Sequence, residues 1–343
     1  MSAQALSGIT ITKNGTITFA NTCSTSDLLI EYLQGETTEA ILLTRVACIQ
    51  LLSRRRESPG DFLLRLTYLA EHATYDGAQL IVFPAYTAFA YLTLAYPEAQ
   101  LYFGPGLAQG IRRIWPSYGA SNFNEFLDFF KGLARKHRTY IVPGTMLTPT
   151  GRGVTNTSYL ISPAGTTIGT QQQTHLNRDE RGSGFVNGDD LQVFATPLGN
   201  LGFAICEDAW YPEVVRILTL KGAQIIIAPI AVPKPYSKWH QVRGMWQNIQ
   251  QNQVFGIESC LTGFLGGVEF EGRSTIYATC EMTPGDTGVL AQAKAAHMED
   301  VFTAGLDFIK LGETIRRFDI FSQFNVPLYK QWFPHLYREY PPH

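Results

Sequence analysis

The feature that most constrains the fold of this chain is a segment that occurs twice. Residues 77–84 read GAQLIVFP, and residues 222–229 read GAQIIIAP. In both copies a glycine is followed by a short apolar run that ends at a proline, which is typical of a buried strand that follows a helix. Recurrence of this helix–strand unit predicts two related halves, and therefore two packed sheets with helices on the outside.

The surrounding patterns extend this unit into an α/β domain. In the first half, residues 43–51 form a predicted strand, and residues 61–75 form a predicted helix with apolar side chains at helical spacing. In the second half, residues 201–206 form a predicted strand and residues 212–221 a predicted helix. Between the halves we predict a helix at 123–137, a strand at 140–144 and a hairpin of strands 157–161 and 166–170.

The chain divides into a domain and two ends. No linker rich in glycine, serine or charge interrupts residues 42–312, which we therefore interpret as one domain. Residues 1–41 form an N-terminal extension, in which alternation around an Asn-Gly turn predicts a β-hairpin over 9–19 and residues 24–34 favour a short helix. Residues 313–343 are rich in aromatic residues and proline and are predicted to form a C-terminal arm that packs on its own or a neighbouring subunit.

Composition limits the classes of partner. Hydrophobic residues make up 45% of the chain and charged residues 16%, which is enough for a large core and indicates that further surface is covered by a partner. The net charge of −2 and the lack of a long basic run argue against nucleic acid. We also find no signal-peptide pattern and no apolar run long enough to span a bilayer. The expectation is a cytoplasmic protein without a membrane partner.

One of the five cysteines is a candidate for chemistry. The five are scattered without CxxC pairs or nearby histidine pairs, which argues against a disulfide framework or a zinc site, and no cofactor is implied. Cys206 ends a predicted strand, and a thiol at a strand-to-helix turn can meet backbone N–H groups that favour a thiolate and stabilise an oxyanion. The alternative is a buried structural cysteine, which is our interpretation of Cys48 and Cys260.

The residues that follow Cys206 favour a reactive thiol over a buried structural cysteine. Residues 205–213 read ICEDAWYPE, and this segment is similar to the cysteine signature of the nitrilase, or carbon–nitrogen hydrolase, superfamily. The resemblance continues in the family's order through motifs at 77–84, 144–145, 174–176, 222–229, 251–254 and 272–274. It covers roughly residues 42–312 and implies a four-layer α-β-β-α sandwich, here with an N-terminal hairpin extension and a C-terminal arm.

The resemblance also implies a catalytic triad, of which this sequence keeps one member. The family uses a glutamate after the strand-ending Phe-Pro as general base, a lysine two residues before the His-Leu pair to hold the oxyanion, and the cysteine as nucleophile. These positions fall on Ala85, Gln173 and Cys206, and Gln251 stands where a glutamate commonly precedes Asn-Gln-Val. Loss of a general base costs about 10²–10⁴ in rate, and loss of an oxyanion donor costs roughly 10²–10³.

Other residues near these motifs could contribute to the site. Glu180 lies near where some family members carry a second active-site glutamate, so it is a candidate base, or else a structural carboxylate. His175 could pair with Cys206, although a histidine here usually packs structurally. Glu207 adjoins Cys206, but neighbours at a strand end point to opposite sides. Three aromatic residues could line a pocket or lie in an interface: Tyr86, Trp210 and Tyr211. Three further residues are expected to cap or anchor the helix that follows Cys206: Asp208, Glu213 and Arg216.

Three functional hypotheses remain open. The first is a pseudoenzyme that binds a small molecule or serves assembly without efficient hydrolysis. The second is a cysteine-dependent amidase or nitrilase that acts on a small amide, nitrile or carbamoyl compound, either inactivated by these substitutions or using Glu180 as base. The third is a structural subunit of an active paralogue. In each case the family resemblance predicts a homodimer or a higher homo-oligomer with the helix at 212–221 in its interface. The apolar side chains of the C-terminal arm are expected to dock as well, on a neighbouring subunit or, as the alternative for both segments, within one subunit.

Overall fold

The computed structural model describes residues 9–11, 17–19, 43–118 and 122–339. The helix expected at 24–34 lies outside these residues. Strands β1 (Ile9–Ile11) and β2 (Ile17–Phe19) pair antiparallel, with Ile9 opposite Phe19, which confirms the expected N-terminal hairpin.

The first half of the main sheet is built around β3 (Leu43–Ser53). Next to it and parallel lies β4 (Leu80–Val82), followed by β5 (Tyr140–Val142), also parallel. The other strands of this half pair antiparallel and are β6 (Thr145–Pro149), β7 (Val154–Ile161), β8 (Thr167–Gln172) and β16 (Asp300–Asp307). Pairing of β7 with β8 confirms the second expected hairpin.

The second half has the same parallel centre and is joined to the first. Its parallel strands are β10 (Gly199–Phe203), β11 (Ile225–Ile230) and β12 (Phe255–Leu265). Its antiparallel strands are β9 (Val193–Thr196), β13 (Val268–Phe270), β14 (Thr275–Tyr277) and β15 (Val289–Gln292). Because β12 also pairs with β3, with Leu261 opposite Leu51, the two expected sheets join into one 14-stranded mixed sheet.

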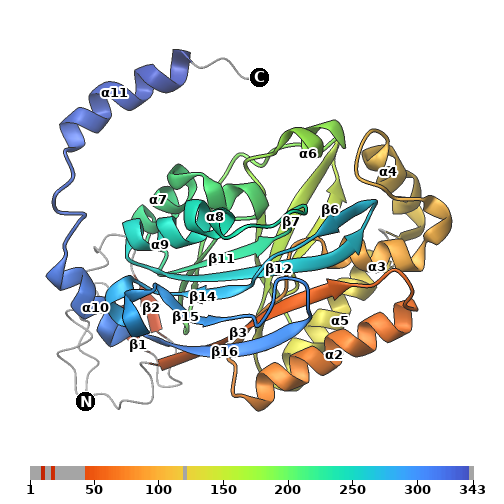
Figure 1. The fold of residues 1–343 in the computed structure, drawn as a ribbon, viewed down its shortest axis with the longest axis horizontal. Helices are drawn as coiled ribbons and strands as arrows, with labels where there is room; N and C mark the ends of the chain where they lie inside the picture. The colour runs from red at the N-terminus through yellow and green to blue at the C-terminus, as the bar shows by residue number, and fades with distance from the viewer. Residues whose placement is uncertain (1–8, 12–16, 20–42, 119–121, 340–343) are drawn as a thin grey trace.

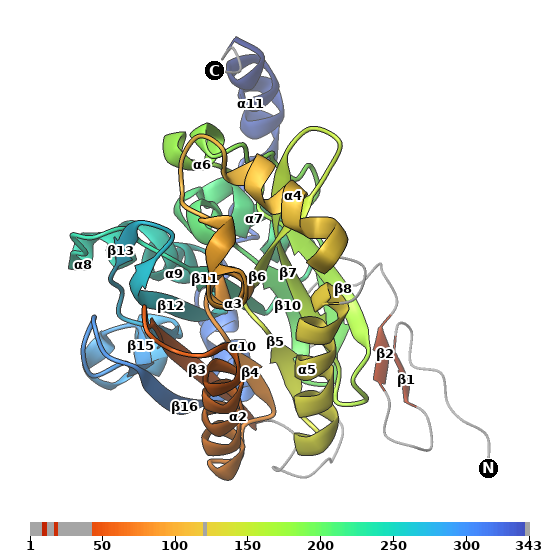
Figure 2. The same cartoon turned by 90° about the vertical axis from the view of Figure 1, so that its right-hand side faces the viewer.

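Helices cover the two outer faces of this folded sheet (Figures 1 and 2). On one side lie α2 (Pro59–Tyr75) and α5 (Asn122–His137), and on the other lie α7 (Pro212–Leu220) and α9 (Gln247–Asn252). The remaining helices are α3 (Thr87–Ala95), α4 (Leu107–Tyr118), α6 (Arg178–Gly182), α8 (Lys238–Gln241), α10 (Phe308–Arg317) and α11 (Val326–Glu339). Strands inside and helices outside confirm the α/β class.

The repeated sequence segment corresponds to a repeated structural unit. Helix α2 begins with Pro59 and α7 with Pro212, and proline is well tolerated in the first helical turn. Each helix is followed by a glycine in the left-handed region, Gly77 at φ +82° and Gly222 at φ +96°. A side chain would strain these turns, which explains why glycine opens both copies of the segment. The strands that follow, β4 and β11, are buried along their whole length.

The strand predicted at 201–206 ends earlier than expected. Strand β10 stops at Phe203, and Cys206 opens the 3-10 turn η3 (Cys206–Trp210). The φ of Cys206 is +47°, a left-handed conformation that cannot continue a strand. The thiol therefore sits on a tight turn after the strand, and not within it.

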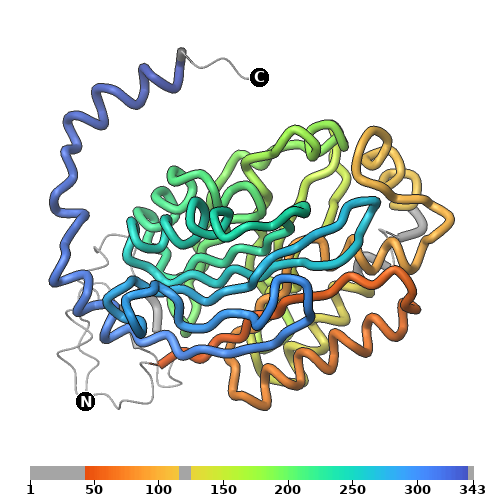
Figure 3. Tube along the Cα trace, viewed as in Figure 1, coloured from red at the N-terminus to blue at the C-terminus, as the bar shows by residue number. Residues whose placement is uncertain are grey.

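The C-terminal arm runs along the outside of the molecule (Figures 1 and 3). Helix α10 crosses residue 312, where we placed the domain boundary, and α11 leaves Leu328, Trp332 and Phe333 about half exposed. Contacts connect the arm to α7: the Arg216 guanidinium lies 5.3 and 5.1 Å from the ring centres of Phe321 and Phe324, and the Tyr337 hydroxyl donates to Glu213 at 2.5 Å. Within the described ranges, no helix is both long and apolar enough to cross a membrane.

Candidate active site

The turn that carries Cys206 is held by the buried carboxylate of Asp208. This carboxylate accepts hydrogen bonds from the backbone N–H of Ile205 at 3.3 Å, of Thr174 at 3.0 Å and of His175 at 2.7 Å. A left-handed non-glycine residue costs on the order of 1–3 kcal/mol and persists only where its surroundings impose it. Asp208 supplies that constraint, so it anchors the turn to the 174–175 loop and not to α7 as the sequence suggested.

Two polar side chains approach the Cys206 thiol. The Asn156 Nδ2 atom lies 3.8 Å from Cys206 Sγ and donates to Gln173 Oε1 at 2.8 Å. The second is Tyr86, whose pKa is raised by burial first, then by Glu180 and by the neighbouring Cys206 thiol. Asn156 was not identified from the sequence, because it lies in a polar strand segment without a recognisable motif. Its burial at 1% exposure is a property of the folded chain alone.

Glu180 is the centre of a buried hydrogen-bond network next to Cys206. Its carboxylate accepts from the Tyr86 hydroxyl at 2.8 Å, from the backbone N–H of Asn177 at 2.9 Å, and from Gln173 Nε2 at 3.1 and 3.0 Å to its two oxygens. Burial raises the pKa of Glu180 to about 7, although these hydrogen bonds act in the opposite direction. The structure thus brings Glu180, Gln173, Tyr86 and Cys206 together, as their candidate roles require.

The electrostatic surroundings of Cys206 disfavour a thiolate. Burial raises the pKa of its thiol well above the usual value, and the carboxylates of Glu180, Glu207 and Asp208 raise the pKa further. Only the backbone N–H of Ala231 acts in the opposite direction among the strongest influences on this group. Reactive cysteines are found in electropositive, partly exposed surroundings, whereas Cys206 is 6% exposed beside three acidic groups.

The two positions that the family resemblance assigned to the base and the lysine hold groups without charge. Ala85 directly follows the Phe83-Pro84 end of the β4 segment, and its methyl group is fully buried. Gln173 points at Glu180 and also donates to the backbone carbonyl of His175 at 2.7 Å. Gln173 is 1% exposed, and its side-chain nitrogen is already shared among protein acceptors.

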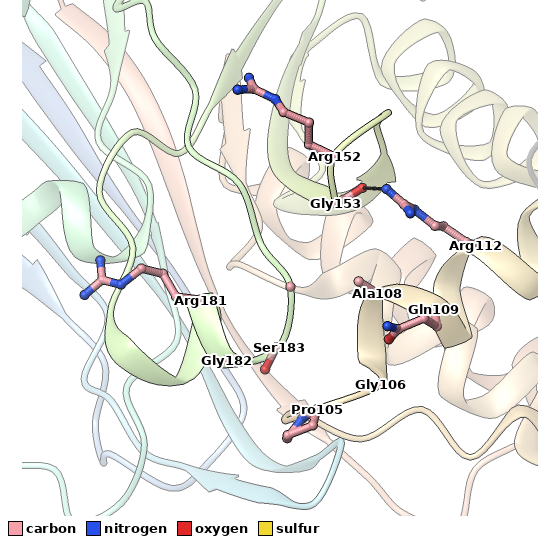
Figure 4. Close-up of a pocket in the computed structure, with 11 residues that line it drawn as sticks. Pro105, Gly106, Ala108, Gln109, Arg112, Arg152, Gly153, Arg181, Gly182 and Ser183 are labelled. Carbon is pink, nitrogen blue, oxygen red and sulfur yellow. Dashed lines mark hydrogen bonds between the residues drawn. The ribbon is translucent and has the colours of Figure 1, made fainter. Parts of the chain in front are cut away.

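Aromatic rings surround Tyr86. Its ring centre lies 5.2 Å from that of Phe103 and 6.4 Å from those of Phe89, Phe185 and Phe270. Tyr86 itself is 3% exposed. The described residues include two surface cavities of about 280 and 520 Å³ that Cys206 does not line (Figure 4 shows the first).

The other candidate residues have partners of their own. His175 Nδ1 lies 3.1 Å from Asp208 Oδ1, and its ring stacks on Tyr211 at 4.0 Å between ring centres. Glu207 accepts from Asn177 Nδ2 at 2.9 Å. Trp210 packs against the rings of Trp239 and His240 at 5.6 and 5.2 Å. Among the described residues, no group of three or more histidine, cysteine, aspartate or glutamate side chains is placed to hold a metal ion.

Comparison with known proteins identifies a family match over most of the chain. Residues 45–314 match the model of the carbon–nitrogen hydrolase family. The chain is 26% identical over 245 residues to the probable hydrolase YhcX of Bacillus subtilis (strain 168), an alignment that covers 70% of this chain and 45% of that protein. It is 28% identical over 235 residues to a nitrilase of Pyrococcus abyssi, covering 68% of this chain and 81% of the relative. The chain thus spans less than half the length of the Bacillus protein.

Solved structures share the fold. A carbon–nitrogen hydrolase from Helicobacter pylori G27 superposes with a TM-score of 0.67 at 20% identity, covering 85% of this chain and 98% of that one. A variant of the amidase from Nesterenkonia sp. AN1, which shows covalent addition of the acetamide moiety of fluoroacetamide at its active-site cysteine, gives a TM-score of 0.64 at 19% identity and covers 87% of this chain and all of that one. These matches confirm the nitrilase-like fold that the motifs predicted.

Proposed function

The chain belongs to the carbon–nitrogen hydrolase family, and from that premise we propose that it is a pseudoenzyme, which binds a small molecule or serves assembly without efficient hydrolysis. The observation that carries this proposal is the environment of Cys206. Its thiol is buried among carboxylates, and the strongest charged influences on its pKa all favour the protonated form. Hydrolysis requires a thiolate, a base to generate it and a donor for the oxyanion.

The neighbours of Cys206 supply these functions poorly. Ala85 cannot accept a proton. Gln173 can donate a neutral hydrogen bond, but its nitrogen already contacts Glu180 and the His175 carbonyl. A ligand that used this amide would have to displace one of these acceptors. Ala85 and Gln173 are therefore proposed to be degenerate triad positions, with Cys206 as the retained nucleophile position.

A second candidate function is slow cysteine-dependent hydrolysis with Glu180 as base. It is favoured by one observation: the Tyr86 hydroxyl donates to Glu180 at 2.8 Å, and the Cys206 thiol is among the neighbours that raise the pKa of Tyr86. A proton leaving the thiol would pass to the Tyr86 oxygen while the phenolic proton moves to the Glu180 carboxylate. With a pKa of about 7, Glu180 is partly ionised at neutral pH and could accept it.

The ligand class follows from the relatives. The Nesterenkonia amidase variant carries an acetamide moiety at its cysteine, so a small amide, nitrile or carbamoyl compound is the proposed ligand of this chain. Binding at Cys206 would require Tyr86 to move out of its aromatic surroundings. A third role, as the structural subunit of an active paralogue, would not require that movement.

Assembly is part of the proposal. Helix α7 leaves Ile217 at 44% and Leu220 at 61% exposure, and α11 leaves Trp332 and Phe333 at 51% each. Large exposed apolar side chains are typical of an interface where they gather into a patch. We propose that α7 and the arm associate with a second copy of the chain.

Activity assays test the proposal. Purified protein is incubated with a panel of small amides, nitriles and carbamoyl compounds, and ammonia release is compared with that of Cys206→Ala. The expected result is no difference beyond trace release. Turnover within the common enzyme range of about 1–10³ per second, abolished by Cys206→Ala, would overturn the pseudoenzyme proposal. Slow turnover that needs both Cys206 and Glu180 would favour the second candidate.

A further inference from the structure

A second candidate site lies away from Cys206, in the cavity of about 280 Å³. Three segments form its walls: the start of α4, the turn between β6 and β7, and the end of α6 (Figure 4). Its charged lining side chains are Arg112, Arg152 and Arg181, and the described lining residues include no carboxylate. A concave surface lined by positively charged side chains favours the binding of an anion.

The positive charge of these arginines is not neutralised by the protein. None of the three forms an ion pair with a carboxylate among residues 43–118 and 122–339. Arg112 donates to the backbone carbonyls of Thr150 at 2.7 Å and Gly153 at 3.4 Å, and Arg181 donates to that of Leu176. The Arg152 guanidinium has no partner in the described part of the chain. By contrast, the buried Arg65 pairs with both Glu57 and Glu299.

The orientation of the side chains leaves room for a ligand. In Figure 4, Arg112 reaches across to the Gly153 carbonyl, whereas the guanidinium groups of Arg152 and Arg181 point away from the other labelled residues and would turn inward to contact a ligand. A guanidinium carries five N–H donors, so these arginines keep free donors beyond their present bonds. Because Arg152 has no partner to lose, it can turn toward a bound anion at little cost.

The backbone shapes the cavity. The first turn of α4 forms one wall, and its Ala108 N–H donates to the Ser183 carbonyl at 3.2 Å. Gly106 and Gly182 lie on two different walls of the cavity. A Cβ atom added at either glycine would meet no atom within 4 Å, so there is space in front of both. Ser183, at the end of α6, accepts from the backbone N–H of Gly104 at 2.8 Å and connects the two walls.

The cavity shares part of its lining with a larger neighbour. The cavity of about 520 Å³ shares Pro105, Gly106 and Gln109 with the first. Its charged lining side chain is Arg113, and Tyr102 lines it at 58% exposure. The two adjacent cavities, together named the groove, therefore offer a cationic part and an aromatic part. This arrangement suits a molecule with one anionic group and one organic group.

We propose that this groove binds a small organic phosphate, with the phosphate group between Arg112, Arg152 and Arg181. Three positive charges favour a dianion over a monoanion such as a carboxylate, and the planar guanidinium matches phosphate oxygens in paired hydrogen bonds. The site excludes Cys206, so the proposal does not depend on whether the chain hydrolyses amides.

A matched pair of substitutions at Gly182 tests the electrostatics. Gly182→Glu places a carboxylate in the wall, and Gly182→Gln adds the same bulk without charge. Binding of inorganic phosphate and phenyl phosphate is measured by calorimetry and by thermal shift, with sodium chloride at matched ionic strength and sodium acetate as references. We expect saturable phosphate binding that Gly182→Glu weakens at least about tenfold while Gly182→Gln preserves it.

Arginine variants identify the contact. Arg152→Gln is expected to weaken phosphate binding by about tenfold, whereas Arg56→Gln, at an exposed arginine outside the groove, leaves it unchanged. Circular dichroism confirms that each variant is folded. Three outcomes would overturn the proposal: no saturable effect of either phosphate beyond chloride, acetate binding as tightly as phosphate, or phosphate binding that neither Gly182→Glu nor Arg152→Gln weakens.

Discussion

The amide nitrogen of Gln173 lies 3.1 and 3.0 Å from the two carboxylate oxygens of Glu180. This contact pairs a buried acid with a neutral donor at the position where the family resemblance implies a lysine. A cation there would lower the pKa of Glu180, whereas with the amide burial prevails and the pKa rises to about 7. A lysine at this position would also place a cation in the network that includes Cys206, so one substitution would change both groups.

Restoring the triad should therefore have a cooperative effect. Gln173→Lys would pair with Glu180, and Ala85→Glu would return a base to the end of β4. Because such residues act as a unit, the double variant should exceed either single variant by about 10²-fold or more in amide hydrolysis. The assay uses the amide and nitrile panel, with Cys206→Ala added to the double variant as control. A folded double variant that is inactive across the panel would show that the surrounding pocket has also changed.

Tyr86 is expected to control access to the thiol. Tyr86→Ala removes the ring and should cost on the order of 3–5 kcal/mol of stability, while raising the rate at which iodoacetamide alkylates Cys206. Tyr86→Phe keeps the ring and should leave alkylation slow. Peptide mass spectrometry follows Cys206, with the partly exposed Cys280 as an internal reference. Rapid, selective labelling of wild-type Cys206 below neutral pH would contradict this prediction.

The buried Glu258 should make stability depend on pH. It accepts from Gln241 at 3.1 Å and from the Tyr277 hydroxyl, and burial raises its pKa from 4.5 to about 7. The folded state therefore holds the proton more tightly than the unfolded state. This contribution to stability is full below about pH 4.5, decreases as the pH rises, and is lost above about pH 7.

The Glu258→Gln side chain keeps an oxygen that can accept from Gln241 and Tyr277, but it cannot ionise. At pH 8 it should raise the free energy of unfolding by on the order of 2–3 kcal/mol relative to wild type, and near pH 5 the difference should shrink toward zero. Denaturant unfolding at both pH values measures this, with the exposed Glu313→Gln as control. An equal effect of Glu258→Gln at both pH values would show that packing, and not ionisation, is responsible.

The exposed face of α7 should form a dimer interface. Light scattering after size-exclusion chromatography is expected to give twice the chain mass of 38.2 kDa. Leu220→Glu, at a residue 61% exposed, should shift the protein toward the monomer, whereas Leu64→Glu, at 68% exposure on α2, should not. A wild-type mass of one chain at micromolar concentration would rule out this interface.

Much of the architecture could be predicted from local sequence. The β4 and β11 strands, the helices before them and both hairpins are encoded by short-range periodicity and by glycine or proline at their ends, so a few neighbouring residues suffice. The same holds for the family, because its motifs are contiguous and occur in a characteristic order. The same pattern placed Cys206 at the end of a strand, whereas the strand ends at Phe203 and Cys206 lies on a left-handed turn after it.

The tertiary structure alone decided how the site is connected. Tyr86, Asn156, Gln173, Glu180 and Cys206 come from separate segments, and nothing in their local sequence specifies the hydrogen bonds between them. The role of Asp208 in holding the 174–175 loop likewise depends on a contact between distant parts of the chain. Pairing of β12 with β3, which joins the halves, is a long-range register that neither strand encodes by itself. Local propensity determines which elements form, whereas burial and packing determine which side chains meet.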